Sequence, residues 1–303
     1  MLNIWGLNAD GTGASPVLEV LTALEKHYQQ EHPGVTFANH LHGNDSALGG
    51  LYIGVADIAL MDREPSYIEI DGYQQAMPGR RPFEMQLMHG GIQTAGHSSP
   101  LVVVVNETNP VARLSLAEID ALFNAEPEAQ RSKARTWGDL GLAGSLFARP
   151  ITLYGFAIDS AEAQTFSSKV MHNSRRWVCT YRELHATSSL QVASDIAEAV
   201  RHDPYAIGIT TYDAARDGVR ILAIGSSKDA FLPTQDALRA GQYVLARTVS
   251  VLARADENGH PEGKVRDFLE YLVSPPAQAI ISQNGSYIAL TEDAQVSARK
   301  ALQ

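Results

Sequence analysis

Two stretches of this chain decide its fold, Gly54-Val55-Ala56-Asp57-Ile58-Ala59-Leu60, with Arg63 close behind, and Asp203-Pro204-Tyr205-Ala206-Ile207-Gly208-Ile209. Each stretch begins with turn-forming residues and continues into a short apolar run. That pattern is typical of a turn that leads into a buried strand. Whether helices alternate with these strands decides the fold class, and the residues around the two stretches show it.

The first sixty residues predict strands that alternate with helices. Residues 2–5, 35–41 and 57–61 are short strand-like runs. Between the first two, Ser15 and Pro16 suit a helix start, and apolar residues follow at helical spacing, namely Val17, Val20, Leu21, Leu24 and Tyr28. This alternation predicts an α/β layer with a largely parallel sheet. Ligand loops are then expected at the carboxyl ends of the strands, in the glycine-rich loop 11–16 and the turn 43–46.

Two long apolar strands are expected to connect two lobes. The run Leu101-Val102-Val103-Val104-Val105 is continuous and β-branched, as in a strand buried on both faces. Residues 244–252 form a second such run. Ser115 and Glu118 have capping-box spacing ahead of a helix. We therefore expect residues 1–98 and 248–303 to form lobe 1, residues 99–247 to form lobe 2, and a hinge to close the lobes on a ligand.

The composition excludes several classes of function. The 303 residues carry a formal net charge of −10, which disfavours nucleic acid and anionic membranes as partners. No run approaches the roughly 18 to 20 apolar residues that span a bilayer, so membrane insertion is not expected. Cys179 is the single cysteine. Its apolar and aromatic neighbours predict a buried, inert thiol.

Five segments, taken in order, resemble the phosphate-binding branch of the periplasmic-binding-protein superfamily. They are residues 54–63, the strand and capped helix at 101–123, Trp137-Gly138-Asp139-Leu140-Gly141 with Arg149-Pro150-Ile151, residues 203–209, and the helix, Ser-Pro break and Gly-Ser-Tyr-Ile-Ala-Leu at 268–290. The resemblance implies a type II two-lobed α/β fold. Each lobe would be a mostly parallel sheet flanked by helices, and two crossing strands would join the lobes.

The same resemblance implies a binding function without catalysis. The ligand would be a small oxyanion, phosphate first, held in the cleft between the lobes and delivered to the permease of an ABC transporter. No cofactor is implied, and a monomer is expected. No signal peptide is visible at residues 2–5. The protein is then either cytoplasmic or a mature chain whose signal has been removed, and the resemblance favours a periplasmic or extracellular location.

In this family, loops at helix N-termini hold the anion, an Asp accepts its proton and an Arg supplies charge. Carried over by position, the ligand-binding residues would be Thr12, Gly13, Ser15, Asn44, Asp45, Ser46, Asp57, Arg63, Asp159 and Ser160. Asp57 matches the acidic residue. Arg63 is a candidate replacement for the arginine that the third loop lacks, or a partner of Asp62 or Asp57.

The third ligand loop departs from the family pattern. Phe156 stands in place of the Arg, Ala161 in place of Gly and Glu162 in place of Thr, whereas Ser160 and Phe166 are kept. A carboxylate facing a dianion would repel it. Alternatively, Asp159 caps the helix and Glu162 completes a capping box, which turns its carboxylate away from the ligand. A non-phosphate ligand, either an organic solute or a metal, is therefore an open alternative.

Three further hypotheses compete with anion binding. A metal site would use His40 and His42, which flank Leu41 and therefore point to the same face of a strand. The further ligands would be the carboxylates of Asp45, Asp57 and Asp62 and the imidazole of His89. A phosphoester hydrolase would use a serine and a histidine base, chosen from Ser15, Ser46 and Ser160 with His42 or His97, but the chain has no Gly-x-Ser-x-Gly elbow. Aromatic residues could line a cleft for an organic ligand, namely Trp5, Tyr52, Tyr154 and Phe156.

Overall fold

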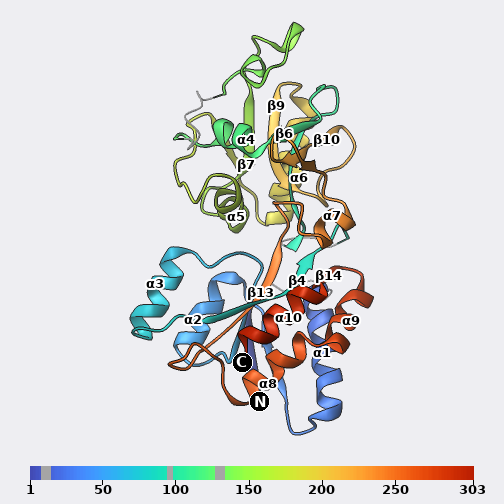
Figure 1. Ribbon diagram of the computed structural model, residues 1–303. Coiled ribbons are helices and arrows are strands. Elements are labelled where there is room, and N and C mark those ends of the chain that lie inside the picture. Colours follow the sequence, from blue (N-terminus) through green and yellow to red (C-terminus); the bar gives the residue numbers. More distant parts are fainter. Residues whose placement is uncertain (8–14, 94–97, 127–133) are drawn as a thin grey trace. The chain divides into compact units, whose positions relative to one another are not determined.

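A computed structural model describes residues 1–7, 15–93, 98–126 and 134–303. The chain forms two compact units, Met1–Ser98 with Arg247–Gln303 (unit 1) and Ser99–Ala246 (unit 2), and it passes between them twice (Figure 1). Arg247 belongs to unit 1, so the expected boundary shifts by one residue. Among the expected site residues, Thr12 and Gly13 lie outside the described residues, as does His97.

Unit 1 is built on a six-stranded sheet in the order β14-β4-β13-β3-β1-β2. Its strands are β1 (Leu2–Gly6), β2 (Phe37–His40), β3 (Ile58–Met61), β4 (Phe83–Gly90), β13 (Thr248–Ala253) and β14 (Tyr287–Ala289). The pairs of β1 with β2 and with β3 are parallel, whereas β13 and β14 pair antiparallel with their neighbours. The sheet is therefore mixed and not mostly parallel, because β13, the strand that returns from unit 2, runs antiparallel to both β3 and β4.

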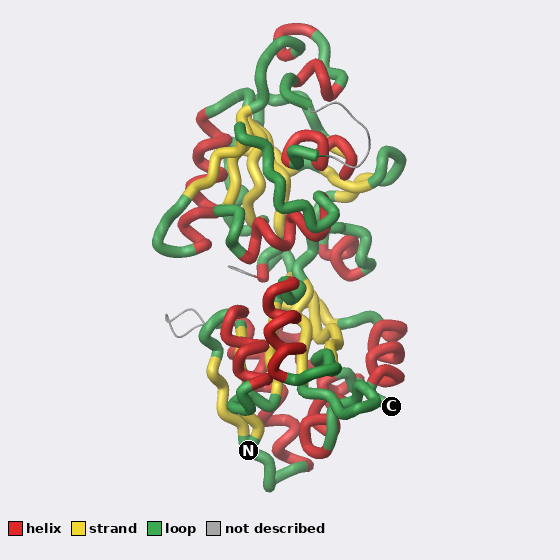
Figure 2. The backbone as a smooth tube through the Cα atoms, turned by 90° about the vertical axis from the view of Figure 1, so that its left-hand side faces the viewer, coloured by secondary structure: helices red, strands yellow, loops and turns green. Residues whose placement is uncertain are grey.

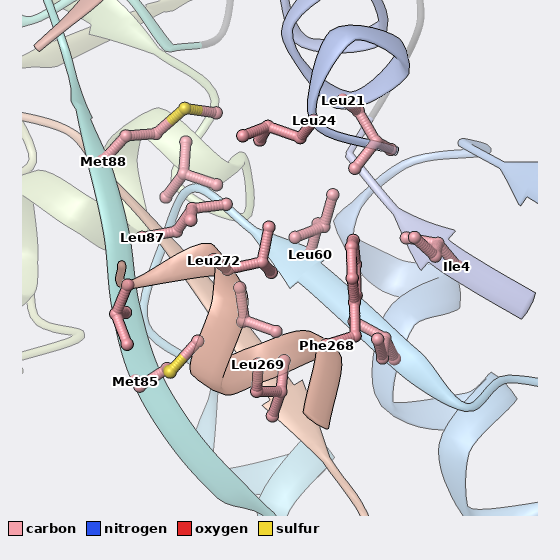
Figure 3. Close-up of a cluster of buried hydrophobic side chains, with 14 of the residues drawn as sticks. Ile4, Leu21, Leu24, Leu60, Met85, Leu87, Met88, Phe268, Leu269 and Leu272 are labelled. Atoms are coloured by element: carbon pink, nitrogen blue, oxygen red, sulfur yellow. The ribbon is translucent and has the colours of Figure 1, made fainter. Parts of the chain in front are cut away.

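Helices cover both faces of this sheet (Figure 2). They are α1 (Pro16–Glu31), α2 (Ala47–Tyr52), α3 (Tyr67–Ala76), α8 (Gly263–Leu272), α9 (Pro275–Asn284) and α10 (Glu292–Ala301). One face packs against α1, α8 and α9. The buried side chains labelled in Figure 3 belong to this cluster, namely Ile4, Leu21, Leu24, Leu60, Met85, Leu87, Met88, Phe268, Leu269 and Leu272. Alternate strand residues face α2 and α3, among them Ala59 and Met61.

Unit 2 contains a five-stranded sheet in the order β10-β5-β9-β7-β8 and a small sheet in the order β12-β11-β6. The bounds are β5 (Leu101–Asn106), β6 (Arg113–Ser115), β7 (Thr152–Phe156), β8 (Tyr181–Leu184), β9 (Ala206–Thr211), β10 (Val219–Ile221), β11 (Ala223–Gly225) and β12 (Ala230–Phe231). The helices are α4 (Leu116–Phe123), α5 (Ala161–Val170), α6 (Ser189–His202) and α7 (Gln235–Arg239). This larger sheet is also mixed, since β7 pairs parallel with β8 and β9 but β5 pairs antiparallel with β9 and β10.

Several local predictions are confirmed. Every residue of β5 is buried, Ser115 and Glu118 form the expected capping box, and α1 buries the expected stripe with Ser15 as N-cap and Pro16 in the first turn. The prediction for Cys179 is wrong, because its side chain is exposed. The aromatic residues around it pack among themselves and leave the thiol outside. Among the described residues, the helices are all too short or too polar to cross a membrane.

Candidate functional site

The carboxyl ends of β1, β2 and β3 lie side by side because β1 pairs in parallel with both neighbours. The backbone closes tightly here. Gly43 N–H donates to the Gly6 carbonyl at 3.0 Å, and Gly6 has a φ of +115° with the Leu60 carbonyl only 2.0 Å from where a Cβ would be. The parallel strands β1 and β2 are connected through α1, so the chain must return along the sheet within that helix. The N-terminus of α1 therefore lies at the same edge as the carboxyl end of β1. The edge thus gathers polar loops and helix starts.

Asn44 and Asp62 join two of these strand ends. The Asn44 Nδ2 atom donates to Asp62 Oδ1 at 2.9 Å, and the Asp62 backbone N–H donates to Asn44 Oδ1 at 3.1 Å. Asn44 opens a 3₁₀ turn (Asn44–Ser46) that continues into α2. Ser46 donates its hydroxyl proton to the Gly43 carbonyl at 2.8 Å. The turn that was expected to bind a ligand is therefore fixed against the residue that follows β3.

Asp62 also forms a fully buried ion pair with Arg247, which directly precedes β13. Arg247 Nη2 lies 3.0 Å from Asp62 Oδ1, and both side chains are 0% exposed. Arg247 Nε donates to the Asp62 carbonyl at 3.0 Å, and Ser98 donates its hydroxyl proton to Asp62 Oδ2 at 3.0 Å. Among the described residues, Arg247 Nη1 is buried and has no hydrogen-bond acceptor. We call Asn44, Asp62, Ser98 and Arg247 the edge cluster.

Asp57 lies at the opposite end of β3. It accepts hydrogen bonds from the backbone N–H and the side-chain amide of Asn3, at 2.8 and 3.0 Å. Arg254, just after β13, lies 3.7 Å away, and these two side chains are 21% and 33% exposed. A strand rises about 3.3 Å per residue, so Asp57 and Asp62 are about 16 Å apart along β3. The structure therefore does not bring Asp57 together with Asn44 and Ser46.

Arg63 is used within unit 1. Its guanidinium bonds Asp45 at 2.7 Å and both carboxylate oxygens of Glu69 at 2.7 and 2.8 Å. The Arg63 side chain is 4% exposed, whereas that of Asp45 is 98% exposed. Burial acts to raise the pKa of Glu69, but hydrogen bonds from Arg63 and from the Ser66 N–H outweigh it and lower that pKa. Arg63 thus fastens α3 to the turn that carries Asp45.

The loop that leads into α5 in unit 2 already carries carboxylate partners. Ser160, not Asp159, is the N-cap, and its hydroxyl accepts from the Ala163 N–H at 3.1 Å. The expected capping box of Asp159 and Glu162 is therefore wrong. Glu162 is 2% exposed and accepts the Ser189 hydroxyl proton at 2.7 Å.

A second carboxylate acts on the same loop. The Ile158 N–H donates to Glu183 Oε2 at 2.9 Å, and Asp159 is exposed. Phe156, in place of the family arginine, is buried at 2% exposure. An anion at this loop would lie near the carboxylates of Glu162 and Glu183, and the Ile158 N–H is already bonded, which disfavours binding there.

The residues of the metal hypothesis are dispersed. The His40 and His42 rings lie 6.2 Å apart and both pack on Trp5, whereas His89 bonds Thr248 at 2.9 Å. Burial lowers the pKa of His89. In the part of the chain that the structure describes, no three His, Cys, Asp or Glu side chains are grouped as metal ligands. For the hydrolase hypothesis, Ser46 and Ser160 have the loop and cap contacts given above, and Ser15 is buried.

Two α/β units, built from one chain that passes between them twice, define the class of two-lobed binding proteins. The chain belongs to the periplasmic-binding-protein (PBP) superfamily, whose domain model matches residues 7–276. It is 22% identical over 298 residues to the phosphate-binding protein PstS of Pseudomonas aeruginosa, covering 97% of this chain and 87% of the relative.

Solved structures share this fold. An ABC-type phosphate transport receptor from Vibrio cholerae superposes with a TM-score of 0.61 at 20% identity, covering 95% of this chain and 99% of the other. PstS from Borrelia burgdorferi has a TM-score of 0.59 at 13% identity, covering 96% and 98%. The predicted family and the two-lobed α/β fold are confirmed.

Sequence reasoning left Ser98, Asp62 and Arg247 out of the predicted ligand set. One signal for Asp62 was available, because it directly follows a buried strand, whereas Asp57 precedes it, and ligands bind beyond the carboxyl ends of parallel strands. For Arg247 the signal was its position immediately before the apolar run of β13.

Proposed function

We propose that this protein is an extracytoplasmic solute-binding protein that binds a small oxyanion, phosphate first, and delivers it to the permease of an ABC transporter. The observation that carries the proposal is the edge cluster, a polar and buried group at the carboxyl edge of the unit 1 sheet in a chain of the PBP superfamily. The protein acts by binding alone, as a monomer, and releases its ligand unchanged.

The chemistry of this edge suits an oxyanion. The N-terminal ends of α1 and of the 3₁₀ turn that leads into α2 belong to it, and helix N-termini favour anions through free N–H groups and the helix dipole. Arg247 supplies positive charge. An ionised Asp62 only accepts hydrogen bonds, so it favours an anion that still carries a proton. Phosphate carries one at neutral pH and sulfate does not.

The relatives support the same ligand. The Pseudomonas aeruginosa protein, aligned over nearly the whole chain, is a phosphate-binding protein, and the Vibrio cholerae structure is of a phosphate transport receptor. Because the identities are 22% and 20%, these names support the class of ligand but do not replace a binding measurement.

Calorimetry on ligand-stripped protein tests the proposal. We expect phosphate to bind and sulfate not to bind. Asp62→Asn should abolish phosphate binding, while the matched variant Asp57→Asn, at the other end of β3, should retain it. If the protein is folded by circular dichroism but phosphate gives neither binding heat nor a thermal shift, the phosphate assignment is contradicted. Loss of binding in Asp57→Asn but not in Asp62→Asn contradicts the choice of site.

A second candidate ligand is an organic solute that carries an oxyanion group. The occupied N–H at Ile158 and the buried Phe156 favour it, because both make the α5 loop a poor site for a bare anion. A thermal-shift series of phosphonates and phosphate monoesters against inorganic phosphate would separate the two. A larger shift with one of the organic compounds supports the second candidate.

A further inference from the structure

The Arg247 side chain uses only one of its two hydrogen-bonding edges. Nε and Nη2 form one edge of the guanidinium. Nε donates to the Asp62 backbone carbonyl, and Nη2 donates to the Asp62 carboxylate. Nη1 lies on the remaining part of the guanidinium and carries two further N–H protons. Arg247 is 0% exposed, and Nη1 has no acceptor among the residues that the structure describes. Such a buried and unsatisfied donor is rare in folded proteins and calls for an explanation.

The other expected sources of positive charge are already used or absent. Arg63 spends its guanidinium on Asp45 and Glu69. The α5 loop of unit 2 has Phe156 where the family places an arginine, and Glu183 accepts its Ile158 N–H. At the carboxyl edge of the unit 1 sheet, Arg247 is paired with Asp62 but still has an unused donor, Nη1, among the residues that the structure describes.

We propose that Arg247 is a ligand-binding residue, whose Nη1 donates to an oxygen of the bound oxyanion. This inference rests on the proposed function. Asp62 and the Asp62 carbonyl hold the opposite edge of the guanidinium, so its plane is fixed before the ligand arrives. A fixed planar donor loses little conformational freedom on binding an oxyanion.

A purely structural role explains the observations less well. A buried ion pair is only a weak source of stability, because burying both charges offsets their attraction. If stability were the whole role, a donor left without an acceptor would add a further cost. An oxyanion oxygen at Nη1 removes that cost, so ligand binding and the buried pair support each other.

Arg247→Lys tests the inference, with Arg254→Lys as the matched control. Lysine keeps the charge beside Asp62, but its ammonium cannot reproduce the planar guanidinium, in which Nε and Nη2 bond Asp62 while Nη1 remains for the ligand. Arg254 directly follows β13, at the end of the strand opposite Arg247, and pairs with Asp57. For the loss of one charge-assisted hydrogen bond we expect phosphate binding to weaken roughly 10- to 100-fold in Arg247→Lys. Arg254→Lys should bind within about twofold of the parent protein.

The outcomes separate this inference from the proposed function. Binding of phosphate by the parent protein, together with unchanged affinity in a folded Arg247→Lys, overturns the role of Arg247 and leaves the function standing. If the parent protein binds neither phosphate nor any other oxyanion, both fail. Should Arg247→Lys not fold, a crystal structure of the parent protein with phosphate decides. An oxygen within hydrogen-bond distance of Nη1 supports the inference, and phosphate bound without touching Nη1 overturns it.

Discussion

Glu25 lies in a buried position that a neutral side chain should suit better than a carboxylate. It is on the face of α1 that packs on the sheet and is 7% exposed. Its Oε2 accepts one hydrogen bond from Asn39 Nδ2 at 3.2 Å. Among the described residues, Glu25 Oε1 and Asn39 Oδ1 are buried and have no donor. Glu25→Gln supplies an amide that can donate to Asn39 Oδ1 and still accept from Asn39 Nδ2, so that it satisfies both residues.

The size of the effect follows from the pKa. Burial raises the pKa of Glu25 from 4.5 to about 7. The folded state therefore holds this proton more tightly than the unfolded state, so the contribution to stability is complete below about pH 4.5 and is lost as the pH rises through about 7. At 1.36 kcal/mol per pKa unit, the loss reaches about 3 kcal/mol by pH 8. Glu25→Gln removes this loss because it does not ionise.

Thermal unfolding across pH measures the difference. For a domain of 150 to 250 residues, each kcal/mol shifts the Tm by about 2–4 °C. We therefore expect Glu25→Gln to match the parent protein near pH 4.5 and to exceed its Tm by roughly 6–12 °C at pH 8. Glu31→Gln is the matched control, because Glu31 is in the same helix but exposed. A gap between Glu25→Gln and the parent that is the same at both pH values refutes the argument.

Three further predictions concern residues around the site and on the surface. Gly6→Ala should fail to give folded protein by circular dichroism, because its Cβ would lie 2.0 Å from the Leu60 carbonyl oxygen at a φ of +115°; a folded variant contradicts the geometry of the edge. Arg63→Met should lower the free energy of unfolding in urea by about 2–4 kcal/mol, since it leaves Glu69 partly buried without its cation, and an unchanged midpoint contradicts this. Cys179 should react with a thiol reagent in the native protein because it is exposed, and reaction only after denaturant is added contradicts its placement.

Much of the fold could be predicted because local patterns carry it. The stripe of α1, the continuous apolar run of β5 and the Ser115 capping box each depend on residues within one element. The sequence of β4 alternates in the same readable way, with Phe83, Met85 and Leu87 buried and Glu84 and Gln86 exposed, although it was not among the predicted strands. The antiparallel half of each sheet was missed, because strand direction depends on where a distant segment returns and not on its own sequence.

The site was harder to predict because its partners are far apart in the chain. Arg247 meets Asp62 across 185 positions, and no local pattern records that pairing. The choice of Asp57 followed the family motif, whereas the rule for carboxyl ends of parallel strands favours Asp62. The exposed Cys179 was missed for a related reason, since apolar neighbours do not show which side of a segment faces the core.

The two Asp-Arg pairs at the ends of β3 and β13 show how burial distinguishes a structural contact from a candidate binding group. Asp57 and Arg254 are 21% and 33% exposed, and solvent-screened pairs of this kind contribute about 0–1 kcal/mol. Asp62 and Arg247 are 0% exposed, so the same pair of residue types must offset a large desolvation cost. The buried pair also leaves a donor without an acceptor among the described residues. Removing Arg247 should therefore reduce both stability and anion affinity. Removing Arg254, which also donates to the Leu51 and Ala56 carbonyls, should reduce stability but leave the affinity unchanged.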